Sequence, residues 1–121
     1  MERFQAVTET SYLTAQNAPL YRRIMRIFFE EYEKMHFQLY KEDVLELLRT
    51  YPDYTDYTLD QLKLDLDSLT AWKNLTATQD PKRVYTIADY KNKQYRYAMT
   101  DGAVEVERLT VKLENLFIEK G

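Results

Sequence analysis

Few residues in this sequence could carry out chemistry. It contains one histidine, His36, and no cysteine, so the residue types of a structural zinc site are missing. The carboxylates of Glu30, Glu31 and Glu33 would lie around a helix rather than converge on one point, which is typical of a solvated helix face. The sequence also has no nucleophile elbow, phosphate-binding loop or paired-carboxylate motif. It therefore predicts a protein that is not an enzyme and needs no metal, nucleotide or other cofactor.

One segment carries enough positive charge to contact DNA. Within residues 81–97 five cations face one aspartate, which gives +4 and leaves −7 for the rest of a chain whose net charge is −3. That negative remainder opposes approach to phosphates, so the predicted contact is weak and independent of DNA sequence. A solvated hairpin whose tyrosines pack against the sheet is the alternative interpretation. The candidate residues for weak DNA contact are Lys82, Arg83, Lys91, Lys93 and Arg96.

A surplus of apolar residues points instead to contact with protein and to a two-fold dimer. The predicted helix at residues 19–37 has an apolar face wider than one buried stripe, and Leu64 points away from the core. The last helix repeats apolar residues at spacings of three, four and three, as a coiled-coil seam does. One apolar strip, used twice across a two-fold axis, is enough for a dimer. The candidate interface residues are Met25, Ile27, Phe29, Leu64, Val106, Leu109, Leu113 and Leu116.

The stretch that begins at Thr58 organises the elements that must position these surfaces. Thr58 is a suitable N-cap for a helix whose leucines recur at spacings of three, four and three. The leucines from Leu62 to Leu66 also alternate with charged residues, which is the spacing of a strand. Only a helix brings Trp72 onto the same face as the other leucines, so a helix is the favoured interpretation. A short strand follows at residues 75–78, where apolar and polar residues alternate.

These changes of period predict a mainly α protein with a small antiparallel β-sheet (α+β), in which a winged helix-turn-helix is followed by a C-terminal helix. The predicted organisation is an N-terminal arm at 1–17, a winged-helix domain at 18–99 and a C-terminal helix at 100–121. The predicted helices lie near 19–37, 41–50, 58–72 and 101–118. The predicted strands lie near 75–78, 84–87 and 94–99, with a brief first strand within 37–40.

Composition sets the class of protein. A chain of 121 residues with 45% hydrophobic and 31% charged residues forms one globular domain. Only two glycines and three prolines occur, which disfavours an all-β sandwich. There is no apolar run of the roughly 20 residues that a membrane span requires, and no signal-peptide core. We therefore expect a cytoplasmic protein.

Four stretches of the sequence, taken in this order, carry a resemblance to a known protein family: LYRRIMRIFFEEY, DVLELL, LDSLTAWKNLTATQDPKRVYTIADY and YRYAMTDGAVEVERL. In this arrangement the chain resembles the N-terminal part of the JetA family. These are the kleisin-type subunits of bacterial Wadjet plasmid-defence complexes, relatives of the MukF condensin kleisins. The resemblance covers nearly all of residues 4–117. Its most specific part is a W-x-N-L-x-A-x-x-D block, met by Trp72, Asn74, Leu75, Ala77 and Asp80.

The resemblance implies a winged-helix domain that assembles with an SMC-type ATPase, a small tandem-winged-helix subunit and a nuclease subunit. In MukF-like kleisins this domain also joins two copies, which fits a homodimer. The family motif brings no catalytic residues, because the ATPase and nuclease sites lie in other subunits. Family members are several-fold longer, so we expect this chain to be the N-terminal domain of a longer protein.

A DNA-binding transcriptional regulator that uses its basic wing remains the competing hypothesis. Many winged helices place their third helix in the major groove. Here that helix carries Asp60, Asp65 and Asp67 against Lys63 alone, and phosphates would repel such a surface. The sequence therefore favours an interaction module over a regulator.

Overall fold

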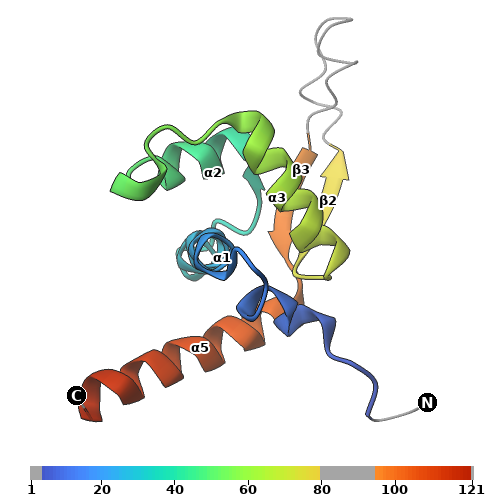
Figure 1. Cartoon of the computed structure of the whole chain (residues 1–121). Helices are drawn as coiled ribbons and strands as arrows, with labels where there is room; N and C mark the ends of the chain where they lie inside the picture. The colour runs from blue at the N-terminus through green and yellow to red at the C-terminus, as the bar shows by residue number, and fades with distance from the viewer. Residues whose placement is uncertain (1–3, 80–94, 121) are drawn as a thin grey trace, which may run out of the picture.

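The computed structural model describes residues 4–79 and 95–120, which form a mainly helical protein with one small antiparallel sheet (Figure 1). The α+β class predicted from the sequence is therefore confirmed. In chain order the helices and strands are η1 (Thr8–Leu13), α1 (Ala18–Glu33), β1 (Leu39–Tyr40), α2 (Lys41–Leu48), η2 (Pro52–Tyr54), α3 (Leu59–Ala71), β2 (Leu75–Gln79), β3 (Tyr95–Met99) and α5 (Asp101–Lys120).

Helix α3 has the start and the apolar face that the sequence predicts. The Thr58 side chain accepts a hydrogen bond from the Gln61 amide at 3.2 Å, and the Gln61 side chain accepts one from the Thr58 amide at 3.0 Å. This capping box satisfies two amides that no helical carbonyl can reach. Leu62 and Leu66 are fully buried, whereas Leu64 is 69% exposed. The helical interpretation of this stretch is confirmed.

Helix α1 ends at Glu33, four residues before its predicted end. Met35 adopts a left-handed backbone conformation, with φ of 68°. The Met35 amide bonds to the Tyr32 carbonyl at 2.9 Å and the His36 amide bonds to the Glu31 carbonyl at 2.8 Å, which is the pattern of a Schellman motif. Glycine usually marks such an end because it adopts positive φ without strain. The sequence has no glycine here, which is why it did not indicate the end.

Helix α1 lies at the centre of the domain rather than on its surface. It packs against α2, η1, α5 and β3, which surround it in Figure 1. Met25, Ile27 and Phe29 are consequently buried, with exposed fractions of 0%, 3% and 5%. The prediction that these three residues form an exposed interface therefore needs correction. Their wide apolar face is covered from several sides within the chain itself.

The sheet has the strand order β1-β3-β2, and both pairs are antiparallel. Tyr97 stands at the centre of β3, paired in register with Leu39 on one side and Ala77 on the other. Only 2% of Tyr97 is exposed, so its ring closes the core beneath the helices. The predicted strands near 75–78 and 94–99 and within 37–40 are confirmed, and the one near 84–87 lies outside the described residues.

Part of the N-terminal arm is docked onto the domain. Helix η1 places Tyr12 in the core, where it is fully buried. The side-chain amide of Asn74 donates a hydrogen bond to the backbone carbonyl of Glu9 at 2.7 Å. The backbone carbonyl of Asn74 accepts one from the backbone amide of Thr100 at 3.1 Å. Asn74 is itself fully buried. It therefore joins η1 to the α3–β2 and β3–α5 connections from inside the molecule.

Asp65, predicted to belong to the acidic outer surface of α3, lies instead on the inner side of the helix. It is 8% exposed, and the Tyr57 hydroxyl donates a hydrogen bond to its Oδ2. Burial disfavours the charged carboxylate and raises the pKa of Asp65 from 3.8 to about 6. The folded chain therefore binds a proton at Asp65 more tightly than the unfolded chain does.

We predict that Asp65 destabilises the folded chain increasingly as the pH rises from 3.8 to about 6. In this window the folded chain keeps a proton that the unfolded chain has lost, so the free energy of unfolding falls as pH rises. Asp65→Asn removes that slope. The free energy of unfolding of the variant, relative to that of the native chain, should therefore rise by about 1–3 kcal/mol between acid and neutral pH. Urea unfolding across this range is the measurement, with the exposed Asp56→Asn as the control. The prediction would be contradicted if the native chain became more stable relative to the Asp65→Asn variant as the pH rises.

Candidate protein-interaction surface

A buried carboxylate joins three elements of the domain. Glu107 lies on the inner face of α5 and is 1% exposed. Its Oε1 accepts a hydrogen bond from Arg26 Nε of α1 at 2.9 Å, and its Oε2 accepts one from the Tyr12 hydroxyl of η1. Burial, followed by the nearby Glu107 charge, raises the pKa of Tyr12 well above its ordinary range. Tyr12 therefore stays protonated and remains a hydrogen-bond donor to Glu107.

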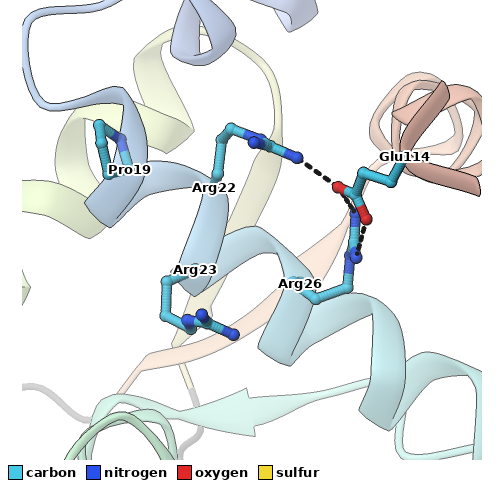
Figure 2. Close-up of a pocket in the computed structure, with 5 residues that line it drawn as sticks. All are labelled: Pro19, Arg22, Arg23, Arg26 and Glu114. Atoms are coloured by element: carbon cyan, nitrogen blue, oxygen red, sulfur yellow. Dashed lines mark hydrogen bonds and ion pairs between the residues drawn. The ribbon is translucent and has the colours of Figure 1, made fainter. Parts of the chain in front are cut away.

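A second carboxylate continues this contact along α5. Glu114 accepts two hydrogen bonds from the Nη1 and Nη2 atoms of Arg26, both at 2.8 Å, and a further one from Arg22 (Figure 2). The hydrogen bond from Arg26 is the main cause that lowers the pKa of Glu114, and the same bond raises the pKa of Arg26. Arg26 therefore bridges two carboxylates that lie seven residues, or two helical turns, apart on α5.

Beyond these contacts α5 carries an exposed apolar stripe. The helix contacts the domain as far as Glu114, and its C-terminal end extends beyond the rest of the domain (Figure 1). Spacings of three and four residues place the exposed side chains on one side of the helix. A row of this kind on one helix is a candidate site for binding a protein. We define the α5 stripe as Leu109, Leu113, Leu116 and Phe117, which are 53%, 45%, 48% and 79% exposed.

Two hollows flank the contact between α1 and α5. The first has a volume of about 390 Å³ and contains three arginines and one glutamate, so we call it the cationic hollow. The second, of about 300 Å³, has a mainly apolar lining, and we call it the apolar hollow. The cationic hollow is lined by Pro19, Arg22, Arg23, Arg26 and Glu114 (Figure 2). The apolar hollow is lined by Leu13, Arg22, Thr110, Leu113, Glu114 and Phe117.

The sequence-predicted interface residues fall into three groups in the structure. The three on α1 are buried, as described above. Leu64 is exposed on α3, where Asp60 and Asp67 lie on the same outer side. On α5, Val106 is half-buried, whereas Leu109, Leu113 and Leu116 are exposed. The described part of the chain therefore leaves α5 as the largest exposed part of the predicted interface.

One of the five predicted DNA-contact residues lies in the described part of the chain. Arg96 is on β3, where it is half-buried and its Nη1 donates to the Gln38 side chain at 3.0 Å. This contact ties Arg96 to the segment before β1 and limits its reach towards a phosphate. The other four, Lys82, Arg83, Lys91 and Lys93, lie outside the described residues.

Sequence reasoning missed the ionic contact between α1 and α5. No burial of Arg26 or Glu107 is predicted from the sequence, yet both side chains are largely buried. A signal was present: Glu107, Thr110 and Glu114 recur at spacings of three and four, the period of a helix face that packs. Arg22 and Arg26 are four residues apart on α1, so they lie on one face of that helix, as Glu107, Thr110 and Glu114 do on α5. Helical period alone does not say which two faces meet, so the pairing needed the structure.

His36 lies on the surface beyond the end of α1. Its Nδ1 is 3.1 Å from a carboxylate oxygen of Glu31, and this hydrogen bond is the main cause that lowers the pKa of Glu31. Across residues 4–79 and 95–120, no group of three or more histidine, aspartate and glutamate side chains is placed to hold a metal ion. In the same ranges no helix has both the length and the apolar character that crossing a membrane requires.

Fold and surface together define a small α+β domain whose last helix is anchored by a buried ion pair and carries an exposed apolar stripe. The chain belongs to the DUF2397 family, a protein family of unknown function, and the family model matches residues 10–121. The matched range runs from within η1 to the end of α5, so it includes Tyr12, Arg26 and Glu107. No curated protein and no solved structure gives a significant match to the chain.

We predict that Glu107→Gln lowers the free energy of unfolding by about 3 kcal/mol, because it removes one partner of a buried ion pair. The matched control is Glu105→Gln on the exposed side of α5, where Glu105 pairs with Arg108 at 2.6 Å. An exposed pair of this kind contributes less than about 1 kcal/mol. Urea unfolding of both variants measures the difference. Equal losses for the two variants would show that the buried pair does not anchor α5.

Proposed function

We propose that the chain is a non-catalytic interaction module, the N-terminal winged-helix domain of a kleisin subunit in an SMC-type complex that acts against plasmid DNA. The observation that carries the proposal is the α5 stripe, a row of exposed apolar side chains on an anchored helix. A helix held rigidly at one end presents such a row at low entropic cost to a partner.

The order of elements supports the winged-helix part of the proposal. Helix α1, strand β1, helices α2 and α3 and strands β2 and β3 follow one another, and the sheet has the order β1-β3-β2. A winged helix has this order, with its wing between the last two strands.

The W-x-N-L block supports the resemblance to JetA-type kleisins in a structural role. Trp72 packs edge-on against the Tyr21 ring, with centroids 5.2 Å apart, and Asn74 and Leu75 are buried. The block therefore shapes the fold and brings no catalytic group. On this resemblance the partners are an SMC-type ATPase, a small winged-helix subunit and a nuclease subunit, in the cytoplasm.

Self-association is the part of the proposal that can be tested with this chain alone, without its proposed partners. Two copies related by a two-fold axis would cover the α5 stripe of each with that of the other. A stable interface buries roughly 800 Å² per partner. The stripe, together with the exposed Ile118 at the end of the described side chains, offers the apolar centre of such a contact.

We predict a dimer by light scattering at micromolar concentration, and folded monomers for Leu113→Glu and Leu116→Glu. A buried glutamate at either position would lack a partner and oppose association. Leu64→Glu is the matched control, since Leu64 is also exposed but lies on α3, and this variant should remain dimeric. A native chain that stays monomeric would refute the dimer. A folded monomer of Leu64→Glu alone would move the interface to α3.

For DNA we predict weak binding without sequence preference. The outer side of α3 exposes Asp60 and Asp67, and Asp67 already pairs with Lys63 at 2.6 Å. Titration of labelled 20-base-pair duplexes should show affinity that falls steeply between about 50 and 200 mM salt and is equal for unrelated sequences. Tight binding to one defined sequence at physiological salt would favour a transcriptional regulator instead.

A further inference from the structure

The cationic hollow has positive charge that the described residues do not fully neutralise. Arg22, Arg23 and Arg26 line it together with one carboxylate, that of Glu114, which pairs with Arg22 and Arg26. Within the described residues, no carboxylate lies within ion-pair distance of Arg23, whose guanidinium carbon stands 4.0 Å from the centre of the Tyr51 ring. Stacking of this kind uses the flat face of the guanidinium and leaves its N–H edges available to an acceptor.

The apolar hollow adjoins this charge directly. It shares Arg22 and Glu114 with the cationic hollow, so the two hollows meet at the ion pair between these residues, and we call them together the α1–α5 groove. Leu113 and Phe117 line the apolar half and are exposed to solvent. Apolar and cationic surface therefore lie side by side along the contact of α1 with α5.

From this juxtaposition we propose that the α1–α5 groove binds an acidic, amphipathic helix of a partner protein. Leucine-type side chains of that helix enter the apolar hollow, and carboxylates on its flank reach Arg22 and Arg23. A helix laid into a groove by its apolar face is a common mode of recognition, and arginine suits carboxylates because its donors match both oxygens. The inference rests on the proposed function as an interaction module and names the chemistry of one partner.

Glu114 occupies the place that a carboxylate of the partner would take. It accepts hydrogen bonds from both Arg22 and Arg26 (Figure 2). Arg26 keeps Glu107 as a second partner, whereas Glu114 is the described carboxylate that pairs with Arg22. Glu114 is thus an internal competitor for the incoming acid. Removing its charge should tighten binding of an acidic helix, an effect opposite in sign to the loss of an arginine.

A nucleic-acid strand fits this groove less well than an acidic helix does. Glu114 at the centre of the groove repels phosphates, and the apolar half offers leucine and phenylalanine side chains rather than a continuous cationic track. A protein partner uses both halves, because its apolar face and its carboxylates can lie on the same helix.

The test uses the whole chain and a defined probe. The probe is a fluorescein-labelled, 18-residue helical peptide with leucine on one face and glutamate on both flanks, and its matched control has glutamine for every glutamate. Fluorescence anisotropy at low salt measures both affinities. We expect the glutamate peptide to bind about tenfold more tightly than the glutamine peptide, and to weaken as salt is raised.

Variants of the chain locate the site. Arg23→Glu should weaken the glutamate peptide about tenfold, the uncharged Arg23→Gln by about threefold, and Glu114→Gln should strengthen it about threefold. Lys112→Glu makes the same change of charge as Arg23→Glu on an exposed residue of α5 outside both hollows, and should leave affinity within about twofold. Circular dichroism confirms that each variant is folded.

Several results would overturn the proposal. These are equal affinity for the two peptides, equal losses for Arg23→Glu and Lys112→Glu, weaker binding after Glu114→Gln, or a single-stranded 20-mer DNA that displaces the peptide. Leu116 lines neither hollow, so a folded Leu116→Glu monomer that still binds the peptide supports the groove separately from the dimer. Because the proposed dimer covers Leu113 and Phe117, which also line the apolar hollow, the folded Leu116→Glu monomer decides the question. If this monomer binds no acidic peptide, the groove is refuted and the dimer of the native chain is left standing.

Discussion

The buried carboxylate of Glu107 is the constraint on which the C-terminal part of the domain depends. A charge removed from water at this depth is costly unless it is paired and hydrogen-bonded, and here Arg26 and Tyr12 supply both. The two donors come from α1 and η1, so the carboxylate is satisfied only when both elements are in place. Direction and rotation of α5 are therefore fixed together with the docking of the N-terminal arm.

Anchoring of the first half of α5 determines what the second half presents. The inner face of the helix, through Glu107, Thr110 and Glu114, is taken up by η1 and α1. The leucines of the α5 stripe lie on another side of the same helix, and about half of each residue is left exposed by the described chain. Helix α5 is thus divided into a part that belongs to the domain and a part that is available to a partner, and the groove beside α1 lies at the boundary.

The sequence predicted most of the elements because helices α2, α3 and α5 are amphipathic or capped by recognisable residues. It could not predict that α1 is central, since a wide apolar face is equally suited to neighbours in the chain and to a partner. Met25, Ile27 and Phe29 were assigned to the partner for that reason, and the chain covers them instead. The ends of α1 and α3 use Met35 and Lys73 at positive φ, where glycine would have given a signal.

The candidate site was predictable in its apolar part and not in its charged part. Leu109, Leu113 and Leu116 follow a helical period that the sequence displays, and the structure leaves them exposed. The arginine cluster depends on α1 and α5 meeting across about ninety intervening residues, as in the pair of Arg22 with Glu114. Such a pairing of distant faces follows from tertiary packing and has no local pattern.

Hydrogen–deuterium exchange along α5 tests the central claim most directly, because it separates the anchored half of the helix from the available half. The account predicts that amides from Ala103 to Thr110 are strongly protected at every protein concentration. Amides from Leu116 to Ile118, which lie beyond the pairing of Glu114 with Arg22 and Arg26, should exchange fast in dilute solution and become protected as the concentration rises into the micromolar range. Uniform protection along α5 at all concentrations, or concentration-dependent protection confined to α3, would contradict it.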